Sequence, residues 1–224
     1  MVNSLNNLSY RLLEQLRPHI TDDENITLRL VKEEIAVQRA LWLANEYNKA
    51  NRKPSEAEIQ TLSCVSFESV EPDECCLTGC NVVRTVSEIP IPVTSKQGLT
   101  ITGVYSVFPY EKAFDFISYD RIIFSGNGRF TSNNVFSFYY KGKVYLRSKD
   151  DFVHSITKGN IRGVFEDPTE AANIIGCDEL ACYNDDMVYP ITRKCEAHIT
   201  KLVLENLIPK LKEDKINDAT SNIE

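Results

Sequence analysis

The strongest constraint on the fold is a change in the spacing of apolar residues, which occurs twice along the 224-residue chain. Residues 4–62 repeat at helical spacing, the period becomes two from Ser63, and a helical pattern returns after Phe165. We therefore expect an α+β protein in which the N- and C-terminal helices form a helical bundle. An antiparallel β-sandwich or barrel unit is inserted in it, and an extended C-terminal arm follows.

This pattern predicts four segments. Residues 1–62 form the N-terminal helical part of the body, and residues 63–166 form the β-rich insertion. Residues 167–209 complete the body, and the polar residues 210–224 form the arm. A tail of this composition frays in water by itself, so we expect another chain to hold it.

Residues 161–170 (IRGVFEDPTE) mark the return from the insertion to the helical body. Val164 and Phe165 favour a strand. Asp167 is a good helix N-cap, Pro168 suits the first helical position, and Glu170 can bond back to the cap. The segment contains no nucleophile or metal site, so it predicts the fold and no chemistry.

The second helix carries two adjacent apolar stripes, which predict a wide buried face that contacts more than one neighbour. The first stripe is Val31, Ile35, Gln38 and Trp42, and the second is Leu30, Val37, Leu41 and Ala44. Trp42 suits a core position, and it is also a candidate interface residue.

The predicted ends of the helices follow from capping residues and prolines. Ser4 caps the first helix and Pro18 closes it, while residues 21–23 offer caps for the second. Ser55 with Glu58 predicts a short third helix through a capping box. Residues 189–190 start the last helix, which Pro209 kinks or ends.

Strand signals are clearest in the middle of the chain. Residues 135–140 and 143–147 predict a hairpin around Lys141 and Gly142. Residues 89–93 contain two prolines, so they form an edge or extended segment.

Charge and cysteines restrict the class of protein. A net charge of −7 argues against a module that grips nucleic acid, and it suits either solubility or a channel through which DNA slides. Seven cysteines without a secretion signal predict reduced thiols, with a zinc site at Cys75, Cys76 and Cys80 as the alternative. No apolar run is long enough to span a membrane.

Candidate catalytic groups have simpler explanations. Cys195 and His198 can share a helix face, but nothing in the sequence orients them as nucleophile and base. Residues 22–24 and 185–186 are acidic clusters that helix capping explains. The sequence therefore predicts no catalytic residue, no cofactor and no metal.

The loop at residues 126–130 (GNGRF) lacks the residues of a phosphate-binding loop. It is either a flexible turn or a loop that presents Arg129 and Phe130 to a partner, because Arg and aromatic residues are favoured at interfaces. In the arm, the interface candidates are Lys212, Ile216 and Ile223.

Six segments in order along the chain resemble a structural protein of crAss-like bacteriophages. They are residues 15–23 (QLRPHITDD), 38–46 (QRALWLANE), 73–76 (DECC), 125–130 (SGNGRF), 161–170 and 189–191 (YPI). The family resembles head-to-tail connector, or neck, proteins that form rings between portal and tail. The resemblance implies a non-enzymatic subunit.

The partners that the resemblance implies are further copies in a ring of about twelve, the portal protein and the adjacent neck or tail rings. Double-stranded DNA passes without sequence recognition, and no membrane takes part. The location implied is the virion, with assembly in the host cytoplasm. Two alternatives remain: another virion tail-ring component, and an enzyme or ligand-binding domain.

Overall fold

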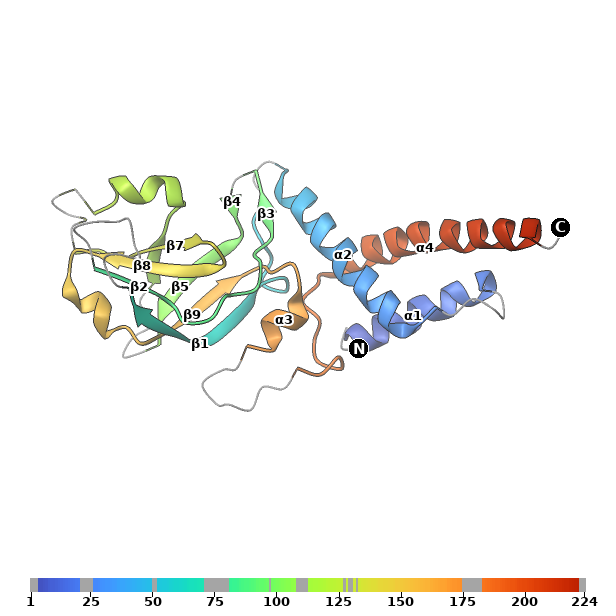
Figure 1. Ribbon diagram of the computed structural model, residues 1–224, viewed down its shortest axis with the longest axis horizontal. Coiled ribbons are helices and arrows are strands. Elements are labelled where there is room, and N and C mark those ends of the chain that lie inside the picture. Colours follow the sequence, from blue (N-terminus) through green and yellow to red (C-terminus); the bar gives the residue numbers. More distant parts are fainter. Residues whose placement is uncertain are drawn as a thin grey trace. The chain divides into compact units, whose positions relative to one another are not determined.

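The computed structural model describes residues 4–20, 26–49, 52–70, 81–96, 98–107, 113–126, 128, 131, 133–174 and 183–221, with the backbone alone for 210–221. It divides into two compact units. A helical unit comprises residues 1–58 and 184–224, and a barrel unit comprises residues 59–183. Figure 1 shows helices in the first and strands in the second.

The helical unit combines the two ends of the chain. Its elements are α1 (Leu5–Leu16), the 3₁₀ helix η1 (Arg17–His19), α2 (Leu28–Tyr47) and α4 (Arg193–Ser221). The three α-helices contact one another, and their shared core buries one apolar side of each. The fully buried residues include Leu12, Leu16, Ile35, Leu43 and Ile199.

Capping explains most helix boundaries in this unit. Ser4 Oγ accepts a hydrogen bond from Asn7 N at 3.2 Å, which confirms the predicted cap of α1. The cap of α2 is Thr27, a few residues later than expected, because its hydroxyl accepts from Leu30 N at 3.3 Å. The predicted caps at residues 21–23 lie outside the described residues.

Two predicted helix boundaries are wrong, and of the two alternatives at Pro209, a kink or an end of the helix, the end is wrong. Ser55 N donates to Glu58 Oε2 at 2.9 Å as in a capping box, but only a turn forms, because strand pairing begins at Gln60. Helix α4 begins at Arg193, because the Thr192 hydroxyl accepts from Cys195 N. Pro209 lies inside α4 on its exposed side, where water can solvate the carbonyl left without a partner.

The barrel unit contains nine strands among its described residues, three short helices and a small separate sheet. The strands are β1 (Gln60–Ser69), β2 (Asn81–Thr85), β3 (Thr94–Ser95), β4 (Gly98–Leu99), β5 (Ile101–Ser106), β6 (Ala113–Phe116), β7 (Phe136–Tyr140), β8 (Lys143–Ser148) and β9 (Lys158–Gly163). The helices are η2 (Tyr119–Phe124), η3 (Asp151–Ser155) and α3 (Pro168–Ala172).

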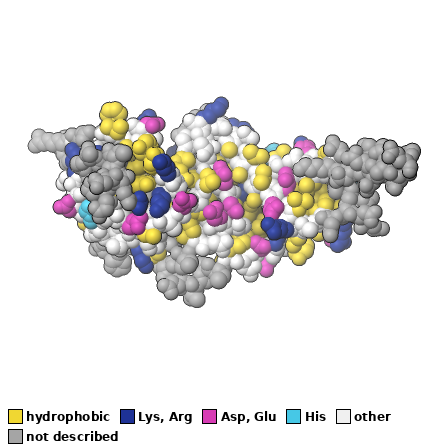
Figure 2. All heavy atoms as spheres, in the orientation of Figure 1, with side chains coloured by type: hydrophobic (Ala, Val, Ile, Leu, Met, Phe, Trp, Pro, Cys, Tyr) yellow, Lys and Arg dark blue, Asp and Glu magenta, His cyan; other side chains and the backbone are white. Residues whose placement is uncertain are grey.

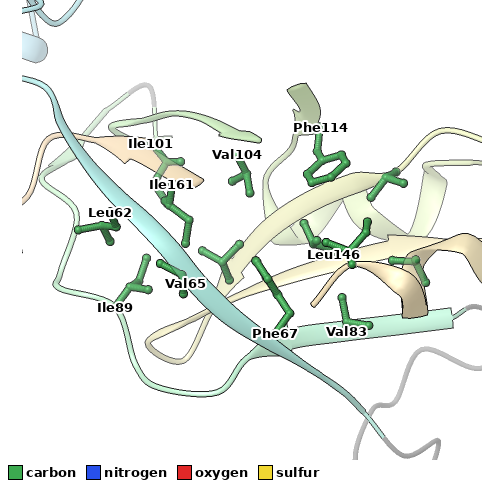
Figure 3. Close-up of a cluster of buried hydrophobic side chains, with 14 of the residues drawn as sticks. Leu62, Val65, Phe67, Val83, Ile89, Ile101, Val104, Phe114, Leu146 and Ile161 are labelled. Carbon is green, nitrogen blue, oxygen red and sulfur yellow. The ribbon is translucent and has the colours of Figure 1, made fainter. Parts of the chain in front are cut away.

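Seven of these strands close into a barrel in the order β1-β2-β8-β7-β6-β5-β9, and β3 pairs with β4 alone. The pairing is antiparallel except between β6 and β7, where Asp115 faces Phe136 in parallel register. The predicted β insertion is therefore a closed barrel with one parallel pair. Apolar side chains from its strands point toward one another in the interior, as Figure 3 shows.

One turn of the barrel follows its sequence signal, and one strand contains a bulge that the sequence did not indicate. The predicted hairpin joins β7 to β8, and Lys141 and Gly142 both have positive φ, at 46° and 79°. This pair of values suits the right-handed twist of the two strands. In β1, Cys64 has φ 55° at a bulge between Leu62 and Val65.

The cap that follows β9 has the predicted form, but the helix that it starts, α3, belongs to the barrel unit, and the chain enters the helical unit only at Asn184. Asp167 Oδ1 accepts hydrogen bonds from Thr169 N at 2.7 Å and Glu170 N at 3.4 Å at the start of α3. Val93 N donates to Val164 O and Glu166 N donates to Ile91 O, both at 2.9 Å. The proline-containing segment therefore pairs as extended chain along one side of the joint.

Candidate assembly interface

The two apolar stripes of α2 have different environments. Val31 and Ile35 of the first stripe are fully buried, and Gln38 and Trp42 are almost so. Leu30, Val37 and Leu41 of the second stripe are 43%, 52% and 54% exposed. The expectation of one wide buried face is therefore wrong for the single chain, since half of that face meets solvent. An exposed apolar row on a rigid helix is typical of a binding surface.

Helix α4 carries a second apolar surface. A shallow open groove of about 530 Å³ runs along it, with side chains of mainly apolar character at its walls. Its lining residues are Ala197, Thr200, Lys201, Leu204, Glu205, Ile208 and Pro209. Figure 2 shows hydrophobic side chains exposed among charged ones on this unit.

Trp42 lies under other side chains of the helical unit. Its ring stacks on His198 with centroids 5.8 Å apart, and the Arg52 guanidinium lies 5.4 Å from its centroid. With only 7% of its surface exposed, Trp42 anchors α2 to α4 and is not part of the exposed apolar row.

Buried ionic groups hold α2 and the start of α4 in place. Glu58 is fully buried and accepts from Tyr47 Oη at 2.9 Å and from Thr192 Oγ1 at 3.3 Å. Arg52 bridges Glu58 and the buried Glu46, at 3.5 Å and 2.7 Å. The exposed rows are thus mounted on helices fixed by specific bonds.

The acid response of this unit should depend on Glu46. A hydrogen bond from Lys49 lowers the pKa of Glu46 below its ordinary value of 4.5, and the charges of Lys194, Lys49 and Arg52 lower it further. Because the folded pKa is the lower one, the stabilisation is complete above pH 4.5 and disappears as the pH falls through the folded pKa.

We expect Glu46→Gln to lower stability at neutral pH and to flatten its decline between pH 5 and 3. Urea titrations followed by the fluorescence of the single tryptophan would measure this. Glu14→Gln, on an exposed carboxylate, is the control. An unchanged acid profile in Glu46→Gln would refute the role of this carboxylate.

Arg129 and Phe130 lie outside the described residues, but a related surface precedes them. Ile123 and Phe124 at the end of η2 are 63% and 79% exposed. Arg147 of β8 holds this turn from below, donating to Ile122 O and, at 3.5 Å, to Ser125 Oγ. These two residues were not predicted as a contact surface, although two adjacent apolar residues shortly before Gly126 indicate one in the sequence.

The remaining candidates from the arm are not placed by side chain. Lys212 and Ile216 belong to α4, of which only the backbone is described beyond Pro209, and Ile223 lies outside the described residues. Residues 210–221 continue α4 as helix, which replaces the predicted change to an extended arm.

The side chains considered as catalytic candidates take part in the packing and polar contacts of the helical unit. Burial raises the pKa of the Cys195 thiol to about 12, which keeps it protonated and unreactive, while His198 stacks on Trp42. Asp185 pairs with Lys32 at 2.5 Å, and Asp186 accepts from Asn6 at 2.7 Å. Among the described residues, no group of three or more His, Cys, Asp or Glu side chains could hold a metal ion.

The prediction of reduced thiols is wrong for one cysteine. Cys64 is disulfide-bonded, whereas Cys195 is free and buried. Cys64 lies at the bulge of β1, where its backbone departs from regular strand geometry. The zinc alternative at Cys75, Cys76 and Cys80 also lies outside the described residues.

In a comparison with protein families, residues 7–223 match a family described as phage tail ring protein 2. The chain belongs to this family. It is therefore a structural component of the virion of crAss-like phages, and assembles into rings with other virion proteins. No curated protein matches it.

Membership in the phage tail ring protein 2 family gives a reason for the exposed apolar residues of α2 and α4. A subunit that closes a ring needs lateral surfaces, and exposed apolar residues on fixed helices are suitable ones. Among the described residues of this tail ring protein, no helix is both long and apolar enough to cross a membrane.

Proposed function

We propose that this chain is a non-enzymatic subunit of a neck ring that joins the portal to the tail and lines the DNA passage. The observation that carries the proposal is the match to a tail ring family over residues 7–223, almost the whole chain. The neck position, the portal contact and a copy number of about twelve follow from the resemblance described above.

The side chains of the described core support a structural role. The buried nucleophile Cys195 has its thiol pKa raised, and the buried carboxylates Glu46 and Glu58 are engaged by cations and hydroxyls. Such groups fix helices in place and have no free coordination or proton-transfer position.

The charge of the chain supports a place along a DNA conduit. At −7 the subunit repels phosphates, so a ring of many copies would let DNA slide through without adhering. We assign the lateral contacts to the helical unit, residues 1–58 and 184–209, the attachment of neighbouring tail proteins to the barrel unit, residues 59–183, and portal docking to residues 210–224.

A second candidate is a ring farther along the tail, away from the portal. The family description names a tail ring without a position along the tail, so it agrees with this candidate as well. The two candidates share the lateral contacts and differ in the neighbours above and below.

An electron cryo-microscopy map of the virion tests the proposal. We expect a ring of about twelve copies of this chain in contact with the portal. A ring that contacts only tail proteins would support the second candidate, and absence of the chain from virions would overturn both. Hydrolase or transferase activity retained by the purified ring would overturn the non-enzymatic assignment.

The C-terminal residues give a separate prediction. Deleting residues 210–224 should leave both compact units folded, because it keeps Cys195, Ile199, Val203 and Leu207, through which α4 is buried in the helical unit. We expect the truncated chain to form lateral contacts but to bind the portal at least about tenfold more weakly. Portal pull-down and sedimentation would measure this. Normal portal binding by the truncated chain would refute the docking role.

A further inference from the structure

A closed ring of more than two copies places a specific demand on its subunit. Each copy must present two different surfaces, one of which meets the other on the next copy, because a surface that pairs with itself stops at a dimer. The tail ring family therefore calls for two complementary lateral surfaces on this chain.

The helical unit supplies two surfaces that fit this demand. One is the α2 row, defined as Leu30, Val37 and Leu41, which projects from its helix. The other is the α4 groove, whose walls include Ala197, Leu204 and Ile208. A row of side chains on one helix packs well into the groove between rows on another.

The two surfaces match in length. The α2 row runs from Leu30 to Leu41 and the α4 groove from Ala197 to Pro209, so they extend about 16 Å and about 18 Å along their helices at 1.5 Å per residue. After docking, little of the apolar surface of either helix would remain exposed to water.

The two surfaces also lie on different sides of the unit. On α4 the buried residues Cys195, Ile199 and Val203 face the core, and the groove residues lie on the opposite side of the same helix. On α2, Glu34 beside the exposed row accepts from Asn206 of α4 at 3.0 Å, so this row borders the inner side of α4. One chain therefore cannot fill its own groove with its own row.

Charge complementarity favours pairing between copies. Glu33, whose 58%-exposed side chain pairs with Arg29 at 2.8 Å, flanks the α2 row, and Lys201 lies at the α4 groove beside Glu205. Lys201 pairs with Glu205 at 3.6 Å and its side chain is 72% exposed, and exposed pairs of this kind are weak. Lys201 is therefore available to a carboxylate that arrives with an incoming α2 helix.

We propose that the α2 row of one copy docks in the α4 groove of the next copy, head to tail around the ring. The inference rests on the proposed ring function, and it adds the two surfaces and the polarity of the lateral contact. Its occupant is a second copy of this chain.

Two single substitutions test the polarity. Leu41→Glu removes the α2 row and leaves the α4 groove intact, while Leu204→Glu removes the groove and leaves the row intact. Both positions are solvent-accessible, so the fold should survive, and circular dichroism melting checks this. Both changes introduce the same charge, so the two altered surfaces repel each other.

Each variant alone should lose self-association by about 100-fold or more, as expected for a charge placed in the centre of an apolar contact. An equimolar mixture should form a one-to-one heterodimer and nothing larger, because only one intact row and one intact groove remain. Sedimentation velocity and mass photometry distinguish these species. Tyr10→Glu, on an exposed residue of α1, should assemble as wild type.

Several outcomes would overturn the inference. They are a Leu204→Glu chain that assembles normally, a mixture that stays monomeric, a wild-type chain that is monomeric at every concentration, or a Tyr10→Glu chain that loses assembly equally. A ring visible in virions despite any of these results would leave the proposed function standing and reject only the docking surfaces.

Discussion

Glu58→Ala should destabilise the helical unit by about 3–5 kcal/mol, the cost of removing one partner from a buried charged network. The carboxylate is completely buried and accepts from Tyr47 Oη and from Ser55 N, each at 2.9 Å. Thr192 and Arg52 add contacts at 3.3 Å and 3.5 Å. The variant removes an acceptor from all four donors; Arg52 keeps its pair with Glu46, but the Tyr47 hydroxyl stays buried.

The state of Tyr47 increases the loss. Burial raises the pKa of the Tyr47 hydroxyl far above its usual range, and the nearby Glu58 charge raises it further, so this group remains a donor. Without the carboxylate, the Tyr47 hydroxyl and the Arg52 guanidinium both lose an acceptor. A buried donor without a partner costs about 1–3 kcal/mol.

Urea unfolding followed by tryptophan fluorescence would measure the effect, because the single tryptophan, Trp42, lies in the same unit. Glu58→Gln keeps one acceptor oxygen and should cost less than Glu58→Ala. Glu14→Ala, whose exposed pair with Arg17 spans 3.0 Å, should change stability by less than about 0.5 kcal/mol. A loss below about 1 kcal/mol in Glu58→Ala would show that the network is not a main support of the unit.

Phe165→Ala should destabilise the barrel unit by about 3–5 kcal/mol, as other large-to-small core changes do. The ring is fully buried in the main apolar cluster of the barrel, which includes Leu62, Ile101 and Ile161. Its backbone forms a bridge with Pro92, and the neighbouring Val164 and Glu166 bond to the same extended segment. The ring therefore fills the interior at the joint that ends the barrel.

The comparison should be made with Phe152→Ala, which removes a ring that is 57% exposed in the same unit. That variant should lie within about 0.5 kcal/mol of wild type. Phe165→Leu should recover most of the loss, because it restores volume. Unfolding followed by tyrosine circular dichroism would measure all three, and equal stabilities for Phe165→Ala and Phe152→Ala would exclude the core role of this ring.

Local signals predicted the features that short stretches of chain can build alone. Ser4 and Asp167 cap their helices, and Lys141 with Gly142 turns the hairpin, because each needs only neighbouring backbone groups as partners. The change of period likewise separated helices from strands, since it reflects which side chains share a face.

The predicted helix boundaries were wrong where a segment far away in the sequence supplied a hydrogen-bond partner. The capping box at Ser55 and Glu58 forms its hydrogen bond, yet Glu58 also binds Tyr47 and Thr192, and the chain then enters β1. Helix α4 begins after Thr192 and not at the predicted residues 189–190. There Arg39 Nε donates to the carbonyl oxygen of Pro190 at 3.1 Å, which holds that residue outside the helix. Such contacts are invisible to local propensity.

The sequence by itself determined the two apolar stripes of α2, the strand-rich middle and the caps, since periodicity and capping depend on neighbours a few residues apart. Only the tertiary structure decided which stripe is buried. Val31 and Ile35 are buried on the side of α2 that contacts α4 and α1. Leu30, Val37 and Leu41 are exposed, since no other described part of the chain packs over them. Burial depends on the position of a second helix that lies far away in sequence, and no local pattern contains that position.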